Sequence, residues 1–240
     1  MRITIYNEGV HEKIDEQVAK VYPEGIHGQL KKVLEYGENT VRCFTLETVN
    51  EITEEVLSQT DVMVWWGHMH HEKVPFEVAW RVREAVNKGM GIIFLHSAHL
   101  ARPFKLLMGT PCTLTWREDG DYERVWVVNP AHPIAQGLGR YFVLPHVESY
   151  GEPFAIPNPE EVVFIGSYEG GEVFRSGCTF HRGNGKIFYF QPGHETFPIY
   201  YDENVQKILR NAVEWARPTL RVETLSCLHP TRPEEIVPEN

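Results

Sequence analysis

Most of the signatures that assign a chain to a class at first sight are missing here. The four cysteines, Cys43, Cys112, Cys178 and Cys227, lie far apart and form no CxxC pair, which argues against a zinc knuckle and against a disulfide framework in a chain of this length. No window approaches the ~20 consecutive apolar residues that a membrane helix requires, and the first residues lack the apolar stretch of a signal peptide. These absences predict a cytoplasmic protein with reduced thiols and no membrane partner.

Basic residues are also scarce. The 240 residues include 23 Lys and Arg against 33 Asp and Glu, which gives a formal net charge of −10. A nucleic-acid backbone needs clustered positive charge, so we expect no nucleic acid among the partners. The apolar share of 42% and the charged share of 23% are those of an ordinary globular protein that buries a sizeable core.

Glycine-rich phosphate motifs are absent as well. The sequence has no GxGxxG after its first apolar segment and no GxxxxGK[ST] anywhere, so a self-contained dinucleotide oxidoreductase or a P-loop enzyme is not expected. An HExxH motif is missing too, so no standard zinc pattern is met.

The first half of the chain alternates short apolar runs with amphipathic segments, which is typical of βα units around a parallel sheet. Apolar spacing predicts one helix through positions 26 to 34 and another from Pro75 to just before Gly89. The expected strands are 2–6, 41–45, 61–66 and 91–95. The last two are almost wholly apolar, as expected for strands that are covered on both faces.

The second half predicts additional antiparallel strands. These are expected at 124–128, 142–147, 162–167, 172–180 and 186–190, with a tight turn at Gly170-Gly171. A last helix should span 204–215, with Asp202 as its cap. We therefore expect an α/β domain over residues 1–217. The extension 218–240 contains Pro230, Pro233 and Pro238 and should be an extended arm or a partner-contact segment.

Histidines follow the ends of several predicted strands. In open α/β sheets the ligand site lies beyond the carboxyl ends of the strands, so residues that follow different strands can meet there. The polar residues at these strand ends are Asn7, Glu8, His11 and Glu12 after the first strand, His68, His70, His71 and Glu72 after 61–66, His96, Ser97 and His99 after 91–95, and Gln191, His194 and Glu195 after 186–190. This convergence predicts a histidine-rich pocket.

The His68–His71 segment suggests a metal site. In a turn, His68 and His71 can face one ion together, and imidazole ligands suit Zn²⁺ or another divalent transition metal. Glu72, Glu148 or Glu195 would supply oxygen ligands. The alternative is that this segment is simply an exposed polar loop.

The corner after strand 91–95 has two interpretations. A strand that turns abruptly into a helix exposes its corner residue above the sheet. Ser97 could be a nucleophile there, with His194 as its base and Glu195 or Glu148 to orient the base. The alternative is that Ser97 only caps the following helix, since the glycines of GxSxG are missing.

Aromatic residues are plentiful near these polar residues. Trp65, Trp66, Trp116 and Tyr150 are among them. Aromatic faces beside carboxylates suit stacking against sugar rings, although a core of this size can also account for them without a ligand.

Several of these stretches together resemble the trehalose-utilisation ThuA-like family. They are 65–68, 94–99, 105–109, 129–134 and 191–195, which read WWGH, FLHSAH, KLLMG, NPAHPI and QPGHE. Segments 7–12 and 25–28 also look like this family, and the similarity spans about positions 1 to 217. The resemblance implies the flavodoxin-like, doubly wound fold of the class I glutamine amidotransferase superfamily, with a mostly parallel sheet and helices on both faces. It also implies a role in sugar catabolism, often alongside sugar oxidoreductases that make keto-sugars.

The resemblance to true amidotransferases fails at the catalytic positions. Those enzymes have a nucleophilic Cys at the corner where this chain has His96 or Ser97, and a His-Pro-Glu sequence where it has His194-Glu195. Glutamine hydrolysis through a thioester is therefore not expected.

The first hypothesis is an enzyme that acts on a disaccharide or keto-sugar with a divalent metal, expected to be zinc. The assigned roles are catalysis for His194, Glu195, His96 and Ser97, substrate binding for His11, His27, Glu148 and Tyr150, and metal binding for His68 and His71. The second is a non-catalytic sugar-binding or accessory protein for a sugar oxidoreductase. A metal-free Ser97 hydrolase is the third. The oligomeric state stays open, with a homo-oligomer as one alternative.

Overall fold

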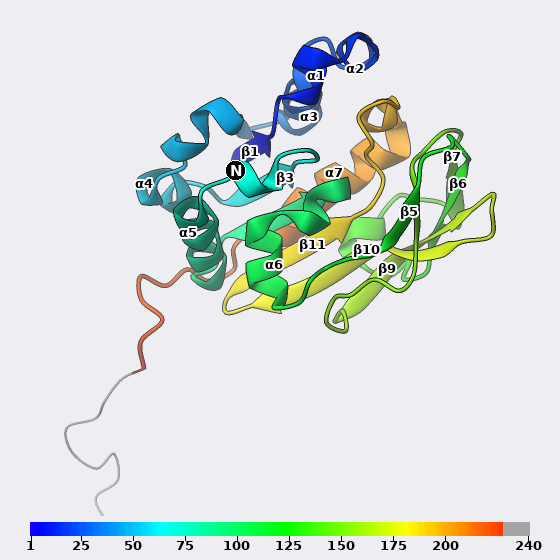
Figure 1. The fold of residues 1–240 in the computed structure, drawn as a ribbon. Coiled ribbons are helices and arrows are strands. Elements are labelled where there is room, and N and C mark those ends of the chain that lie inside the picture. Colours follow the sequence, from blue (N-terminus) through cyan, green and yellow to red (C-terminus); the bar gives the residue numbers. More distant parts are fainter. Residues whose placement is uncertain (228–240) are drawn as a thin grey trace, which may run out of the picture.

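The computed structural model describes residues 1–227, and its centre is a nine-stranded sheet in the order β2-β1-β3-β4-β11-β10-β9-β6-β7 (Figure 1). The first five strands in that order run parallel to one another. They are β2 (Thr40–Phe44), β1 (Arg2–Asn7), β3 (Val62–Trp66), β4 (Gly91–Leu95) and β11 (Gly185–Phe190). The predicted parallel strands are confirmed to within a residue or so.

The other half of the sheet is antiparallel, as predicted. It consists of β10 (Val173–Arg182), β9 (Glu161–Tyr168), β6 (Glu123–Val127) and β7 (Tyr141–Leu144). The predicted glycine turn joins β9 to β10, and Gly171 has a φ of +94°, which favours glycine. A separate two-stranded ribbon pairs β5 (Thr115–Arg117) with β8 (Ser149–Gly151).

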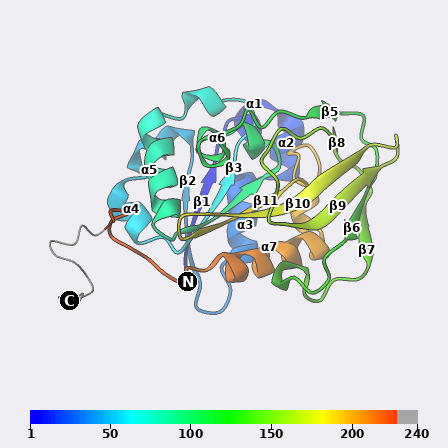
Figure 2. The same cartoon turned by 90° about the horizontal axis from the view of Figure 1, so that it is seen from below.

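Helices cover both faces of the parallel half. Helices α3 (Gly25–Leu34) and α7 (Glu203–Ala216) lie on one face, and α5 (Phe76–Asn87) and α6 (Arg102–Met108) lie on the other (Figure 2). Asp202 caps α7 as predicted, because its Oδ1 accepts N–H groups at 2.8 and 3.1 Å. The expected α/β class with helices on both faces is confirmed.

Three short helices were not predicted. They are α1 (His11–Ile14), α2 (Glu16–Val21) and α4 (Glu54–Ser58). Each is too short to present the repeated apolar spacing from which a helix is recognised. Helix α1 begins with His11, four residues after the carboxyl end of β1.

The core lies between the sheet and its helices. Every residue of β3 and β4 is buried, and Trp65 and Trp66 are both 1% exposed or less. These large side chains explain why the two strands read as continuous apolar runs. No helix among residues 1–227 is long and apolar enough to cross a membrane.

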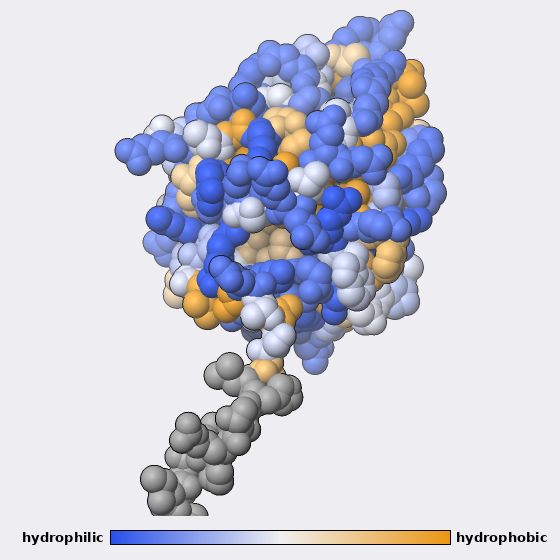
Figure 3. Space-filling view, turned by 90° about the vertical axis from the view of Figure 1, so that its left-hand side faces the viewer, coloured by the Kyte–Doolittle hydropathy of each residue, from blue (hydrophilic) through white to orange (hydrophobic). Residues whose placement is uncertain are grey.

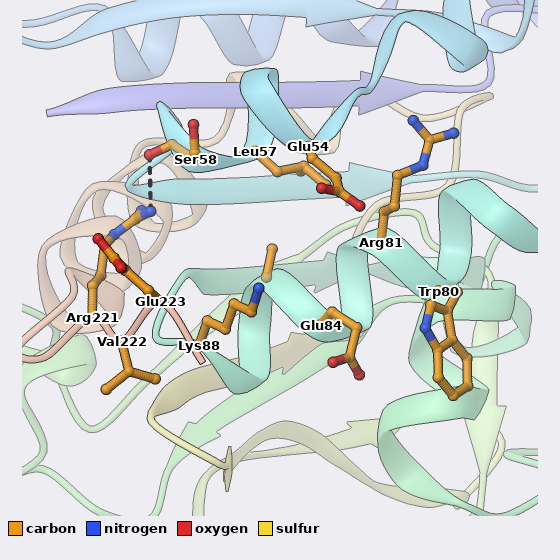
Figure 4. Close-up of a pocket in the computed structure, with 11 residues that line it drawn as sticks. Glu54, Leu57, Ser58, Trp80, Arg81, Glu84, Lys88, Arg221, Val222 and Glu223 are labelled. Carbon is orange, nitrogen blue, oxygen red and sulfur yellow. Dashed lines mark hydrogen bonds between the residues drawn. The ribbon is translucent and has the colours of Figure 1, made fainter. Parts of the chain in front are cut away.

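The chain leaves α7 and continues along α4 and α5. Arg221 donates to the Ser58 carbonyl at 3.1 Å, and the Val222 N–H donates to the Lys88 carbonyl at 3.0 Å. A hollow of about 760 Å³ lies between this arm and the two helices, and charged side chains of both signs line it (Figure 4). Figure 3 looks onto this side of the molecule, where hydrophilic residues cover most of the surface. The predicted arm beyond residue 227, with its three prolines, lies outside the described residues.

Candidate functional site

The predicted pocket residues meet at the carboxyl ends of β1, β3, β4 and β11. They form two adjoining triads, each of two histidines and one glutamate, and the ligand atoms within each triad lie within 4.8 Å of one another. The first triad is His11, His68 and Glu195, and the second is His96, Glu148 and His194. The hollow beside α5 is a different place and shares no residue with them.

The first triad is centred on the Glu195 carboxylate. The Nδ1 atoms of His11 and His68 both contact the same oxygen, Oε1. The other oxygen, Oε2, is buried and has no hydrogen-bond partner among residues 1–227. Glu195 is fully buried, whereas both imidazoles are partly exposed, so the triad opens toward solvent on the histidine side.

The Glu195 carboxylate and each of the two imidazoles stabilise one another's charged forms. Burial opposes ionisation of Glu195, but the hydrogen bonds with His11 and His68 outweigh it and hold its pKa well below the usual range. Burial also opposes the charged form of His68, yet Glu195 raises the pKa of that imidazole. The hydrogen bond to Glu195 raises the pKa of His11 as well. The Glu195 carboxylate therefore stabilises positive charge between the His11 and His68 rings.

The second triad is centred on His96, the corner residue after β4. Its backbone has a φ of +52°, an uncommon value for a residue other than glycine. The His96 Nδ1 donates to the Gln191 carbonyl at 2.9 Å, and its Nε2 lies 2.8 Å from Glu148. Tyr150 stacks on the ring with a centroid separation of 5.0 Å. A carbonyl oxygen only accepts, so Nδ1 carries a hydrogen, and Nε2 faces Glu148.

His194 belongs to the second triad and lies next to the first. Its ring centroid is 5.4 Å from that of His68 and 5.3 Å from that of His96. Its Nδ1 lies 2.7 Å from the Thr196 hydroxyl, which leaves Nε2 directed toward Glu118 at 3.7 Å. Burial lowers the pKa of His194 to about 4, so its ring is neutral at physiological pH.

Ser97 lies beside the site but is turned away from its histidines. Its hydroxyl donates to the Gly67 carbonyl at 2.9 Å. The cap interpretation is wrong, because Ser97 lies inside a 3-10 helix, His96–Leu100, whose N-cap is Leu95, and α6 has Ala101 at its N-cap. The corner position belongs to His96, so the hydroxyl of Ser97 stabilises the end of β3 instead.

Three other predicted residues lie outside the triads. The Nε2 of His71 is buried without a partner among the described residues, and burial lowers the pKa of its ring to about 4. His68 thus shares its carboxylate with His11 and not with His71. The Nδ1 of His27 lies 2.9 Å from the Asn7 amide, one layer behind the pocket, and Glu72 is exposed and lies 3.5 Å from His70.

Glu8, which follows the first strand, is a further site residue whose role was not predicted from the sequence. Its carboxylate is 2% exposed and accepts the backbone N–H groups of His68, Met69 and His70 at 3.0, 3.1 and 2.9 Å. A carboxylate directly after a strand is visible in the sequence, but its backbone partners come from a segment 60 positions away. Glu8 fixes the loop that carries His68.

We expect Glu8→Gln to lower the free energy of unfolding by about 2 kcal/mol, since a carboxamide places N–H groups against buried N–H donors. Hydrogen exchange of the amides of residues 68–70 should accelerate selectively. Urea denaturation and exchange mass spectrometry measure the two effects. Glu47→Gln is the matched control, because the Glu47 side chain is 74% exposed and pairs with the Lys13 ammonium at the surface. Unchanged exchange in Glu8→Gln would contradict this role.

The comparisons with known proteins agree with this architecture. A ThuA-like protein of Parabacteroides merdae has 19% identity and a TM-score of 0.67, with 92% of each chain covered. A second one, from Bacteroides uniformis, has 19% identity and a TM-score of 0.65 over 90% of each chain. A glutamine amidotransferase of Thermotoga maritima has 13% identity and a TM-score of 0.54, over 90% of this chain and 97% of that one. No curated protein sequence matches.

These similarities place the fold in the glutamine amidotransferase-like class. Residues 2–216 match the family described as ThuA, trehalose utilisation. The chain belongs to the ThuA family. The match ends at the last residue of α7.

Proposed function

We propose that this protein processes a disaccharide or keto-sugar and holds a divalent cation at His11, His68 and Glu195. The sugar class comes from the description of the family, trehalose utilisation. The observation that carries the cation is the convergence of two imidazole nitrogens on one buried carboxylate oxygen.

The donor set of the first triad fits a zinc ion. Two histidines and one carboxylate are a recognised catalytic set for Zn²⁺, which keeps a further position for water or substrate. The unpartnered Oε2 of Glu195 supplies an additional acceptor. When bound at such a site, a divalent cation polarises a carbonyl or hydroxyl oxygen and lowers the pKa of water.

The second triad supplies the groups that handle protons. The Nε2 of His194 lies 3.7 Å from Glu118 and 3.8 Å from the Oε2 of Glu195. A sugar hydroxyl bound beside these groups would be within its reach, so we assign the proton transfer to His194. His96 and Glu148 hold each other in one orientation through their 2.8 Å contact. Both are then placed to orient the sugar by hydrogen bonds.

A non-catalytic sugar-binding protein is the second candidate. The observation that favours it is the corner position, where a histidine with a φ of +52° replaces the nucleophile of amidotransferases. Such a protein would bind a sugar without consuming it. A sugar oxidoreductase partner, a homo-oligomer and a cytoplasmic location remain predictions of the sequence analysis.

Elemental analysis of untagged protein, purified without chelators or a nickel column, tests the cation site. We expect about one equivalent of zinc or a similar metal in the wild type. His68→Ala and His11→Ala should lose it, whereas His181→Ala should keep it, since His181 is exposed and contacts Glu160 on another part of the molecule. A metal-free wild type whose melting temperature does not respond to added zinc would show that the cation proposal is wrong.

A further inference from the structure

Trp116 is placed unlike the tryptophans of the core. Its side chain is 65% exposed, whereas Trp65 and Trp66 are buried under the helices. A tryptophan this exposed presents a flat apolar face to the solvent, which a ligand can cover. Trp116 lies in β5, the strand that pairs with β8 beside the second triad.

The strand register shows which way Trp116 faces. Trp116 is directly opposite Tyr150 in the antiparallel pair, and residues that are directly opposite share one face of a ribbon. Tyr150 uses that face to stack on His96. Trp116 therefore lies on the side of the ribbon that is turned toward the pocket, but farther out than Tyr150.

The side chains that follow Trp116 in the sequence point to alternate sides of the ribbon, as this placement requires. Arg117 points to the other side of the ribbon, where its guanidinium donates to Glu172 at 2.7 and 3.0 Å. Glu118, the next residue, has its carboxylate 3.7 Å from the Nε2 of His194. An exposed indole and a carboxylate thus follow one another on the path from solvent to His194.

We propose that Trp116 and Glu118 form an outer sugar subsite of the pocket. This inference rests on the proposed function. One ring of a disaccharide occupies the space at His194, and the second ring places its apolar C–H face on the indole of Trp116. Glu118 accepts hydrogen bonds from hydroxyl groups near the linkage between the rings.

The surroundings of Trp116 favour a small ligand over a protein partner. The adjacent residues on the strand are Thr115 and Arg117, both polar. A protein-binding surface typically has a contiguous apolar patch of roughly several hundred Å². A single aromatic face flanked by hydrogen-bonding groups suits a carbohydrate, which has both apolar faces and hydroxyl edges.

Calorimetric titration with trehalose, maltose and glucose tests the subsite. Trp116→Ala should weaken binding of the disaccharides by about tenfold, whereas glucose should bind as it does to the wild type. Trp116→Phe should retain part of the disaccharide affinity, because it keeps an aromatic face. Trp80→Ala is the matched control, since Trp80 is 44% exposed on α5 and lines the other hollow.

The outcomes separate this subsite from the proposed function. Equal disaccharide affinities in Trp116→Ala and the wild type would overturn the subsite and leave the sugar pocket in place. An equal loss for glucose and the disaccharides would also overturn it, because Trp116 would then act on the inner ring. A wild type that binds metal but none of the three sugars would overturn the disaccharide assignment and the subsite together.

Discussion

His194→Ala should lower the turnover of the sugar substrate by at least about a hundredfold without unfolding the protein, which is the range expected for loss of a proton-transfer group. The ring of His194 lies between those of His68 and His96, which belong to different triads. Turnover of disaccharides and keto-sugars by the metal-loaded protein measures the effect. Circular dichroism and the melting temperature verify the fold.

His181→Ala controls for the loss of an imidazole as such. His181 is exposed and contacts the Glu160 carboxylate, so its removal should leave turnover unchanged. His194→Asn retains a hydrogen-bonding side chain and should fold even if the alanine variant does not. A folded His194 variant with wild-type turnover would refute the assigned role.

Glu123→Gln should stabilise the protein at neutral pH by about 3 kcal/mol. Glu123 lies in β6 with 0% exposure, and its only hydrogen bond within residues 1–227 is at Oε1, which accepts the Ser176 hydroxyl at 2.9 Å. Burial raises the pKa of this carboxyl from 4.5 to about 8, so the folded state holds a proton that the unfolded chain releases. Glutamine is nearly the same size and is neutral in both states, so it avoids this difference in protonation between the folded and the unfolded chain.

The sign of the pH dependence follows from this pKa. Between pH 4.5 and about 8 the wild type loses stability as the pH rises, and the loss ends above the folded pKa. The advantage of Glu123→Gln should therefore be small at pH 5 and largest near pH 8. Urea denaturation at both values measures it, with the exposed Glu47→Gln as the control. A constant difference across this range would contradict a protonated Glu123.

The central strands of the sheet could be predicted from the sequence because their burial shows in their apolar residues. Strands β3 and β4 are buried on both faces and read as continuous apolar runs. The ribbon of β5 and β8 was missed, since each strand has three residues, too few to show alternation. Its pairing depends on tertiary contacts, among them the stacking of Tyr150 on His96.

The candidate site was predictable as a set of residues but not as a set of contacts. Strand ends place His68, His96, His194 and Glu195 at one edge of the sheet. The sequence does not show that His68 turns away from His71 and toward His11, because that choice depends on where Glu195 lies. The role of Glu8 was hidden for the same reason, since its partners are backbone N–H groups.

The position of β11 has a consequence for how the protein is made. This strand is the last of the sheet in sequence, yet it pairs with β4 on one side and β10 on the other. During synthesis the parallel and antiparallel halves therefore expose two unpaired strand edges until β11 emerges from the ribosome, and exposed edges invite aggregation. His11 and Glu195, 184 positions apart, meet only at that moment. Capture of a metal ion would thus report that synthesis has passed β11 and that the two halves of the sheet have joined.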